Sequence, residues 1–249
     1  MLHATIRHKT FTFPCGEPHV QLDTVAPSRV DVLWEFAHPN EIVELLLLED
    51  AIRRAGHRLN MLTIPYVPFA RQDRVNLAGE SLSIAVMARV INGLHATSVQ
   101  ITDPHSDVAP ALIRRCHVVH QHEVFSSYFP IGFGSFHLVS PDAGALKKIY
   151  KLARLVDPTG VIECGKHRDV ATGEISGTTV PNVDVTNGHC IIVDDICDGG
   201  RTFVELAKVL HQRGAGKITL MVTHGFFTKG LQVFDGLIDE IYTRKGRVK

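Results

Sequence analysis

Residues 190–202 read CIIVDDICDGGRT. The run opens with apolar residues typical of a strand buried in a parallel sheet, continues through the acidic pair Asp194 and Asp195, and reaches a short turn with two glycines. The amphipathic stretch that follows, FVELAKVLHQRG, predicts a helix. Backbone N–H groups and the helix dipole at such a turn favour an anion, and glycine lets the backbone approach it closely. We therefore expect a phosphate cradle formed by Asp198, Gly199, Gly200, Arg201 and Thr202.

The acidic pair indicates what accompanies the phosphate. Two carboxylates repel a phosphate, so Asp194 and Asp195 suit the hydroxyls of a ribose diol or a metal that the ligand carries. A phosphate beside a diol indicates a sugar phosphate. The chain contains neither GxxxxGK[ST] nor GxGxxG after a strand, which excludes the P-loop and the Rossmann fingerprint. The alternative is an ordinary strand-to-helix crossover with polar capping residues, and the acidic pair argues against it.

A second informative segment, IPYVPFARQDR, spans residues 64–74. Its two prolines exclude a helix and a central strand, so it predicts a rigid turn at a strand end. The guanidinium of Arg71 offers forked donors that suit a polyphosphate, and Gln72 offers a donor and an acceptor. A surface cluster of Arg–Asp salt bridges is the alternative interpretation.

The two segments together resemble the ribose-phosphate diphosphokinases, which are also called phosphoribosyl diphosphate (PRPP) synthetases. The first segment alone is also similar to type I phosphoribosyltransferases, but these lack the second. The chain is identified as a shortened member of the diphosphokinase family, with a resemblance that runs over roughly residues 11–245. The resemblance implies transfer of the β,γ-diphosphate of ATP to the anomeric hydroxyl of ribose 5-phosphate, with Mg²⁺ on the polyphosphate.

The resemblance also assigns roles to residues of the first half of the chain. Phe13 and Glu17 belong to a turn similar to the one that reaches the adenine of ATP across a subunit interface, which implies at least a dimer. Arg71 and Gln72 are expected to bind ATP, and His105 is expected to meet the ATP phosphates and their magnesium.

In the second half, Asp142 lies in a Ser-Pro-Asp turn that resembles the family's support for a second metal. Lys166 and Arg168 stand where the family carries the cations of a mobile catalytic loop, and we expect them to stabilise the transition state. The glycines of the loop 165–177 favour a mobile lid.

Four departures from the family pattern leave alternatives open. Cys15 replaces an acid near the adenine, and Arg201 replaces a glycine of the phosphate loop. Residues 75–80 almost lack cations, so inherited allosteric regulation is not expected, and the shortened ends put a hexamer in question. The same transfer onto a larger 5-phosphoribosyl compound such as ADP-ribose is one alternative, and a catalytically silent relative that binds PRPP or nucleotides is another. A phosphoribosyltransferase is a fourth and weaker interpretation, after the diphosphokinase and these two alternatives.

Strand-like and helix-like runs alternate along the chain, which predicts an α/β protein with two similar doubly wound, mostly parallel sheets. The Pro- and Gly-rich stretch 129–134 predicts a boundary between an ATP-binding domain, 1–130, and a ribose-5-phosphate-binding domain, 131–249. Ligands of such sheets bind at the carboxyl ends of the strands. The expected strands are 30–37, 61–67, 98–103, 137–140, 190–193 and 218–222, and the expected helices are 40–56, 82–93, 143–155 and 202–213.

Composition limits the partners and the location. The formal net charge of the 249 residues is zero, which offers no basic field for nucleic acid. No apolar run approaches the ~20 residues that cross a bilayer. Five cysteines without CxxC spacing favour reduced thiols in the cytoplasm. The cluster CHVVHQH at 116–122 lacks the separated pairs of a zinc site and predicts an edge strand instead.

Overall fold

The computed structural model describes residues 1–23, 28–129, 134–168 and 175–249, with the side chains of 166–168 and 175–178 left undescribed. The chain divides into two compact units, Met1–Val119 and His120–Lys249. This division comes earlier than the expected boundary at 130–131, because Phe125 and Phe129 are buried in the core of the second unit. Part of the stretch that suggested the boundary, 130–133, lies outside the described residues.

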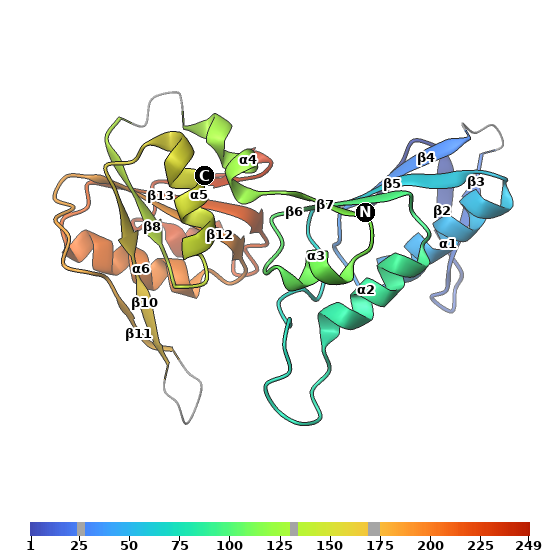
Figure 1. Cartoon of the computed structure of the whole chain (residues 1–249), viewed down its shortest axis with the longest axis horizontal. Helices are drawn as coiled ribbons and strands as arrows, with labels where there is room; N and C mark the ends of the chain where they lie inside the picture. The colour runs from blue at the N-terminus through green and yellow to red at the C-terminus, as the bar shows by residue number, and fades with distance from the viewer. Residues whose placement is uncertain (24–27, 130–133, 169–174) are drawn as a thin grey trace. The chain divides into compact units, whose positions relative to one another are not determined.

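The first unit is built on a five-stranded sheet with the order β1-β4-β5-β6-β7 (Figure 1). The strands β4 to β7 are parallel, and β1 pairs antiparallel with β4 at one edge. The strands are β1 (Leu2–Ala4), β4 (Arg29–Trp34), β5 (Arg58–Ile64), β6 (Ser98–Thr102) and β7 (Cys116–Val119). The helices are α1 (Glu41–Arg54), α2 (Ser83–Gly93) and α3 (Val108–Leu112), and β2 (His8–Thr12) and β3 (Pro18–Leu22) form a separate hairpin.

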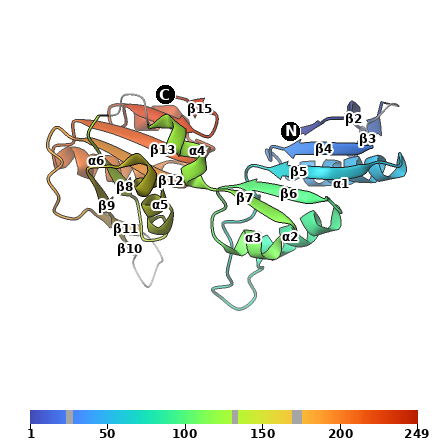
Figure 2. The same ribbon diagram turned by 45° about the horizontal axis from the view of Figure 1, so that its top comes forward.

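All three helices of the first unit lie on the same side of its sheet (Figure 2). The parallel strands follow one another in a single direction, and right-handed crossovers then place every helix on one face. In β4, Val30, Val32 and Trp34 are buried whereas Arg29 and Asp31 are exposed, as expected when one face is covered. The helix α1 buries Leu45, Leu48 and Ile52 against that face at helical spacing.

The second unit contains a six-stranded sheet with the order β15-β14-β13-β12-β8-β9, parallel except for β15. Its strands are β8 (Phe136–Ser140), β9 (Gly160–Glu163), β12 (His189–Cys197), β13 (Lys217–Gly225), β14 (Glu240–Thr243) and β15 (Gly246–Arg247). Its helices are α4 (Gln121–Phe125), α5 (Leu146–Val156) and α6 (Arg201–Gln212), with 3-10 turns η1 (Ser126–Tyr128) and η2 (Leu231–Phe234). A two-stranded hairpin, β10 (Gly165–Arg168) and β11 (Ile175–Thr179), stands apart from the sheet.

The sheet of the second unit is covered on both faces. Successive residues of β12 point to opposite sides, so Cys190 and Ile192 pack in the cluster that α6 completes, whereas Ile191 and Val193 pack with α4 and α5. The strand order reverses between β8 and β12, because one crossover leads from β8 to β9 and another leads the opposite way from β12 to β13. The carboxyl ends of β8 and β12 flank this switch point, where ligands of open α/β sheets bind.

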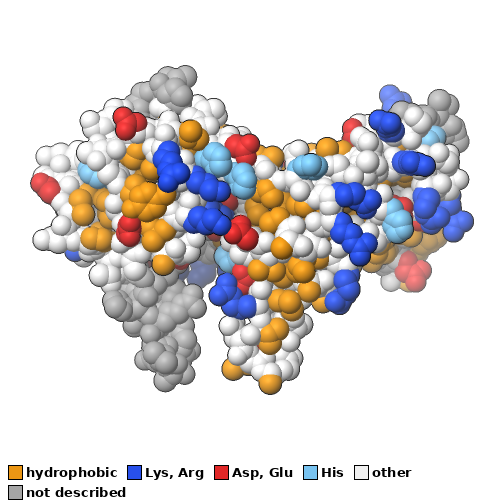
Figure 3. All heavy atoms as spheres, viewed as in Figure 1, with side chains coloured by type: hydrophobic (Ala, Val, Ile, Leu, Met, Phe, Trp, Pro, Cys, Tyr) orange, Lys and Arg blue, Asp and Glu red, His pale blue; other side chains and the backbone are white. Residues whose placement is uncertain are grey.

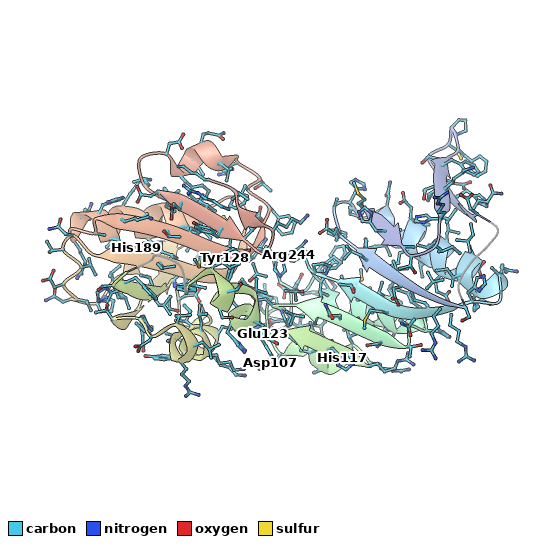
Figure 4. All side chains as sticks on the ribbon, turned by 90° about the horizontal axis from the view of Figure 1, so that it is seen from above. Asp107, His117, Glu123, Tyr128, His189 and Arg244 are labelled. Atoms are coloured by element: carbon cyan, nitrogen blue, oxygen red, sulfur yellow. The ribbon has the colours of Figure 1, made fainter. Side chains whose placement is uncertain are left out.

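The predicted α/β class with two similar, mostly parallel sheets is confirmed. The second unit has the predicted doubly wound arrangement, whereas the helices of the first unit lie on one face of its sheet (Figure 2). The predicted edge strand at 116–122 is correct only as far as Val119. His120 immediately precedes α4, and its ring stacks on His122. Its backbone N–H donates to Oε2 of Glu123, labelled in Figure 4, at 2.6 Å. In the part of the chain that the structure describes, no helix combines the length and the apolar character that crossing a membrane requires.

Candidate functional site

The acidic pair lies near the carboxyl end of β12 and is crowded by a third carboxylate. Asp195 is buried, and its backbone N–H donates to Oδ1 of Asp194 at 2.8 Å. Burial raises the pKa of Asp194 well above its usual range, and the neighbouring carboxylates of Asp195 and Asp142 raise that pKa further. Asp142 follows β8, the neighbouring strand, so the predicted turn and the acidic pair do meet.

Two features of the segment after β8 position these acids. Oδ1 of Asp142 accepts hydrogen bonds from the backbone N–H groups of Gly144 at 3.0 Å and Ala145 at 3.2 Å, just before α5 begins. Lys148, on the first turn of α5, reaches Oδ2 of Asp195 at 3.9 Å. A cation therefore stands beside the buried acid, which lowers the cost of keeping that carboxylate ionised.

The predicted phosphate cradle connects β12 to α6. Gly200 has a φ of 80° and precedes the first residue of α6, and its carbonyl accepts from the N–H of Phe203 at 3.0 Å. A β-carbon on Gly200 would lie 2.5 Å from Cζ of the buried Phe234, so only glycine fits. The first N–H groups of a helix lack intrahelical acceptors, and here they open onto this turn.

The other members of the cradle have particular partners. Asp198 accepts two hydrogen bonds from Thr228, from the hydroxyl at 2.9 Å and from the backbone N–H at 3.1 Å. Arg201 is exposed, and its Nε lies 2.9 Å from Oε1 of Glu205, one turn along α6. Thr202 follows on the first turn of the same helix.

In the first unit, the loops after β5 and β6 come together. Asp73 is nearly buried and pairs with Nε of Arg74 at 2.8 Å. Hydrogen bonds from Arg74 and from the side chain of Ser106, together with the positive charge of His105, hold the pKa of Asp73 at about 2. The Arg-Gln-Asp-Arg segment and the predicted phosphate-binding histidine thus lie side by side.

Arg71 and Gln72 are exposed at this junction. Gln72 accepts from the backbone N–H of Ile84 at 3.4 Å and from the hydroxyl of Ser83 at 3.3 Å, which fastens the loop to the start of α2. The segment after Arg74 exposes apolar side chains, Val75 and Leu77 among them. Figure 3 shows hydrophobic side chains on the surface of the loop that leads to α2.

Phe13 and Glu17 close the turn of the β2–β3 hairpin. The N–H of Phe13 donates to the carbonyl of Glu17 at 2.8 Å, and Gly16 makes the turn with a φ of 95°. Phe13 is 45% exposed and lies edge-on to Phe11, with ring centroids 5.1 Å apart. Two exposed aromatic rings on one hairpin offer apolar surface for a base or for another chain.

Lys166 and Arg168 belong to β10, which pairs antiparallel with β11 in the register Lys166↔Thr178. The expected lid 165–177 is thus partly a hairpin, and its residues 169–174 lie outside the described residues. His105 and Asp142, the two predicted metal partners, belong to different units.

Sequence reasoning missed three residues that the structure places at these sites. Lys148 contacts the acidic pair, Thr228 holds the cradle, and Lys229 lies against Gly199. No short motif contains them, because each is brought in by a neighbouring strand or helix. Asp73 was visible in the motif, but its role as the link to His105 depends on the pairing of β5 with β6.

Comparisons with known proteins identify the family. Two protein-family models match: the N-terminal domain of ribose phosphate pyrophosphokinase over residues 3–94, and the phosphoribosyl synthetase-associated domain over residues 174–244. The phosphoribosylpyrophosphate synthetase from Mycobacterium smegmatis superposes with a TM-score of 0.84 at 22% identity, covering 96% of this chain and 80% of that one. This likeness concerns the fold.

Curated relatives carry the assignment further. The ribose-phosphate pyrophosphokinase of Pyrococcus furiosus is 29% identical over 235 residues, which cover 92% of this chain and 82% of that protein. The ribose-phosphate pyrophosphokinase of Thermococcus kodakarensis is 32% identical over 237 residues, covering 92% of this chain and 81% of that protein. With an identity of this size over nearly the whole chain, and with both halves matched, this protein is a member of the ribose-phosphate pyrophosphokinase family of enzymes.

Proposed function

We propose that this chain transfers the β,γ-diphosphate of ATP to the anomeric hydroxyl of ribose 5-phosphate, which gives PRPP and AMP. The observation that carries this proposal is the 32% identity to a ribose-phosphate pyrophosphokinase across both units, with the phosphate cradle and the Arg-Gln-Asp-Arg loop each formed. In this proposal the first unit binds ATP and the second unit binds ribose 5-phosphate.

In the second unit, the cradle from Asp198 to Thr202 receives the 5-phosphate, because its backbone N–H groups and the start of α6 favour an anion. Asp194 and Asp195 accept hydrogen bonds from ribose hydroxyls, a role that suits carboxylates on a buried strand end. This places the anomeric hydroxyl away from the phosphate, free to react.

In the first unit, Arg71, Gln72 and His105 bind the triphosphate of ATP. Asp73 serves as their anchor, since it fixes Arg74 on one side and the Ser106 loop on the other. A positioning role of this kind matters because phosphoryl transfer depends on alignment and charge more than on covalent catalysis.

In the reaction, the anomeric oxygen attacks the β-phosphorus and loses its proton, the bond to the α–β bridging oxygen breaks, and AMP leaves with that electron pair. Negative charge grows on the equatorial oxygens and on the leaving bridge. Lys166 and Arg168 donate to these oxygens from the β10 strand. Their removal should therefore lower the rate of transfer more than the affinity for substrate.

Mg²⁺ fits the residues present. Repulsion among Asp194, Asp195 and Asp142 raises the pKa of Asp194, and a cation relieves such repulsion. Among the described residues no three metal-binding groups form a site of their own. Mg²⁺ typically uses one or two carboxylates together with substrate phosphates, so Asp142 in the second unit would hold such an ion, and His105 in the first unit would meet an ion that arrives on the polyphosphate. When bound, the ion supplies charge neutralisation.

The larger substrate ADP-ribose has less support. Arg201, Cys15 and the shortened ends suggest it, and the guanidinium of Arg201, the extra cation, is paired with Glu205. A catalytically silent role is also disfavoured, because the acidic pair and the Arg-Gln-Asp-Arg loop stay assembled and the relatives are enzymes.

Self-association to at least a dimer and a cytoplasmic location remain proposals. The exposed Phe11 and Phe13 favour the first, since the resemblance implies that this hairpin reaches the nucleotide of a neighbouring subunit. Five cysteines without a disulfide favour the second.

The decisive experiment incubates the purified protein with ATP, MgCl₂ and ribose 5-phosphate and follows AMP by chromatography and PRPP by ³¹P NMR. We expect equal amounts of AMP and PRPP, and neither product with ADP-ribose. ADP in place of AMP, or consumption of PRPP together with a base, would contradict the assignment.

A further inference from the structure

The turn after β13 is fastened to the phosphate cradle. The backbone N–H of Phe226 donates to the carbonyl of Cys197 at 2.8 Å, and Thr228 makes its two hydrogen bonds to Asp198. Because β12 and β13 are parallel neighbours, their carboxyl ends lie at the same edge of the sheet. The cradle and the turn 226–230 therefore form one structural unit.

Lys229 extends from this turn along the cradle. A β-carbon built on Gly199 would lie 3.5 Å from Cε, 3.6 Å from Cδ and 3.7 Å from Cγ of Lys229. The aliphatic stem thus runs past Gly199, within van der Waals reach of the backbone expected to approach a phosphate. The residue is exposed, so the ammonium ends in solvent beside the start of α6.

The charge of Lys229 has no competing partner in the described part of the chain. No described carboxylate forms an ion pair with its ammonium, and the backbone carbonyl of Lys229, rather than its side chain, accepts from Nε2 of Gln232 at 3.0 Å. Asp198, the nearest acid in the cradle, is engaged by Thr228. By contrast, the guanidinium of Arg201 forms an ion pair with Glu205.

We propose that Lys229 is a substrate-binding residue whose ammonium contacts the 5-phosphate of ribose 5-phosphate held in the cradle. This proposal rests on the proposed function for the identity of the ligand. A phosphate monoester carries close to two negative charges at neutral pH, and backbone N–H groups alone leave most of that charge uncompensated. Because the stem of Lys229 already packs against Gly199, its ammonium can bind the phosphate with little further loss of side-chain conformational entropy.

The test compares Lys229→Met, which keeps the stem and removes the charge, with Lys229→Arg and with Lys208→Met. Lys208 is an exposed residue of α6 that forms no ion pair with a described carboxylate, and its replacement changes the net charge by the same amount. For each variant we would measure kcat, the KM for both substrates, and the Kd for ribose 5-phosphate by calorimetry without ATP. Urea unfolding checks that every variant is folded.

We expect Lys229→Met to raise KM and Kd for ribose 5-phosphate by about tenfold to a hundredfold, the usual worth of a hydrogen bond to a charged group. The kcat and the KM for ATP should change by less than about twofold, Lys229→Arg should keep most of the affinity, and Lys208→Met should resemble the wild type. Equal affinity in Lys229→Met and wild type, or an equal loss in Lys208→Met, would overturn the proposal. Absence of AMP formation by the wild type would instead refute the proposed function, and calorimetry would still decide the role of Lys229.

Discussion

Replacing Gly200 with alanine should weaken the fold and the phosphate cradle together. Two costs arise from the structure. The backbone there has a φ of 80°, and a residue with a β-carbon pays about 1 kcal/mol or more in the left-handed region. The new methyl group would also lie 2.5 Å from Cζ of Phe234, which is fully buried and cannot swing away, and overpacking of this kind costs about 1–3 kcal/mol. The expected loss is about 2–4 kcal/mol in the free energy of unfolding.

Two other glycines of the same unit separate these costs. Gly236 has a φ of 71° and open space around its missing β-carbon, so Gly236→Ala should lose only the backbone cost of about 1 kcal/mol. Gly199→Ala meets only ordinary contacts with the stem of Lys229 and should change stability by less than about 0.5 kcal/mol. Urea unfolding at constant m-value measures all three. If Gly200→Ala lost no more than Gly236→Ala, the packing of Phe234 beneath the cradle would not be what requires glycine there.

Three further changes test other parts of the two units. Asp73→Asn should cost about 1 kcal/mol at pH 7, since the shift of its pKa from 3.8 to about 2 corresponds to at most about 2.4 kcal/mol and the exposure of Arg74 screens part of it. Because the folded-state pKa is the lower one, this stability is present above pH 4 and is lost as the pH falls towards 2, so urea midpoints of variant and wild type should converge there. Lys148→Met removes the cation beside Asp195 and should lower the free energy of unfolding by about 1–3 kcal/mol at pH 7, measured by urea unfolding. An unchanged free energy of unfolding would show that this contact does not stabilise the fold. Lys166→Ala should reduce kcat by about 10²-fold or more at unchanged stability, and an unaltered rate of AMP release would dismiss its catalytic role.

Much of the fold was predictable because apolar runs of the right period mark buried strands and helices. The helix expected at 202–213 is α6, Arg201–Gln212, and the strand expected at 218–222 is the centre of β13. The strand expected at 190–193 continues to Cys197, because Asp194 keeps its place in the ladder opposite Val222 although its side chain is polar. The polar side chains of Asp194 and Asp195 led to a predicted strand end at Val193, whereas pairing with β13 continues the strand to Cys197.

The hairpins were not predicted, since their strands bury little. The β2 strand exposes four of its five residues, so it has no buried face from which an alternating pattern could be read. His120 and His122 were expected on a strand, but the Glu123 carboxylate caps the chain into α4 just after Val119. The hydrogen bond from the backbone of His120 to Glu123 thus favours a helix start, although the alternating pattern of residues 116–122 is typical of a strand.

The residues that sequence reasoning missed share one geometric cause. In a parallel sheet, neighbouring strands end at the same edge, so the segment after one strand lies beside the segment after the next, even when about thirty residues separate them in sequence. Thr228 after β13 binds Asp198 after β12, and Ser106 after β6 binds Asp73 after β5. In both units, a loop with a sequence motif is thus held by a neighbouring segment that has no sequence motif. In each unit, the residues that fix the geometry of the proposed phosphate-binding loop should be sought on the segment after the adjacent strand, where the sequence carries no motif.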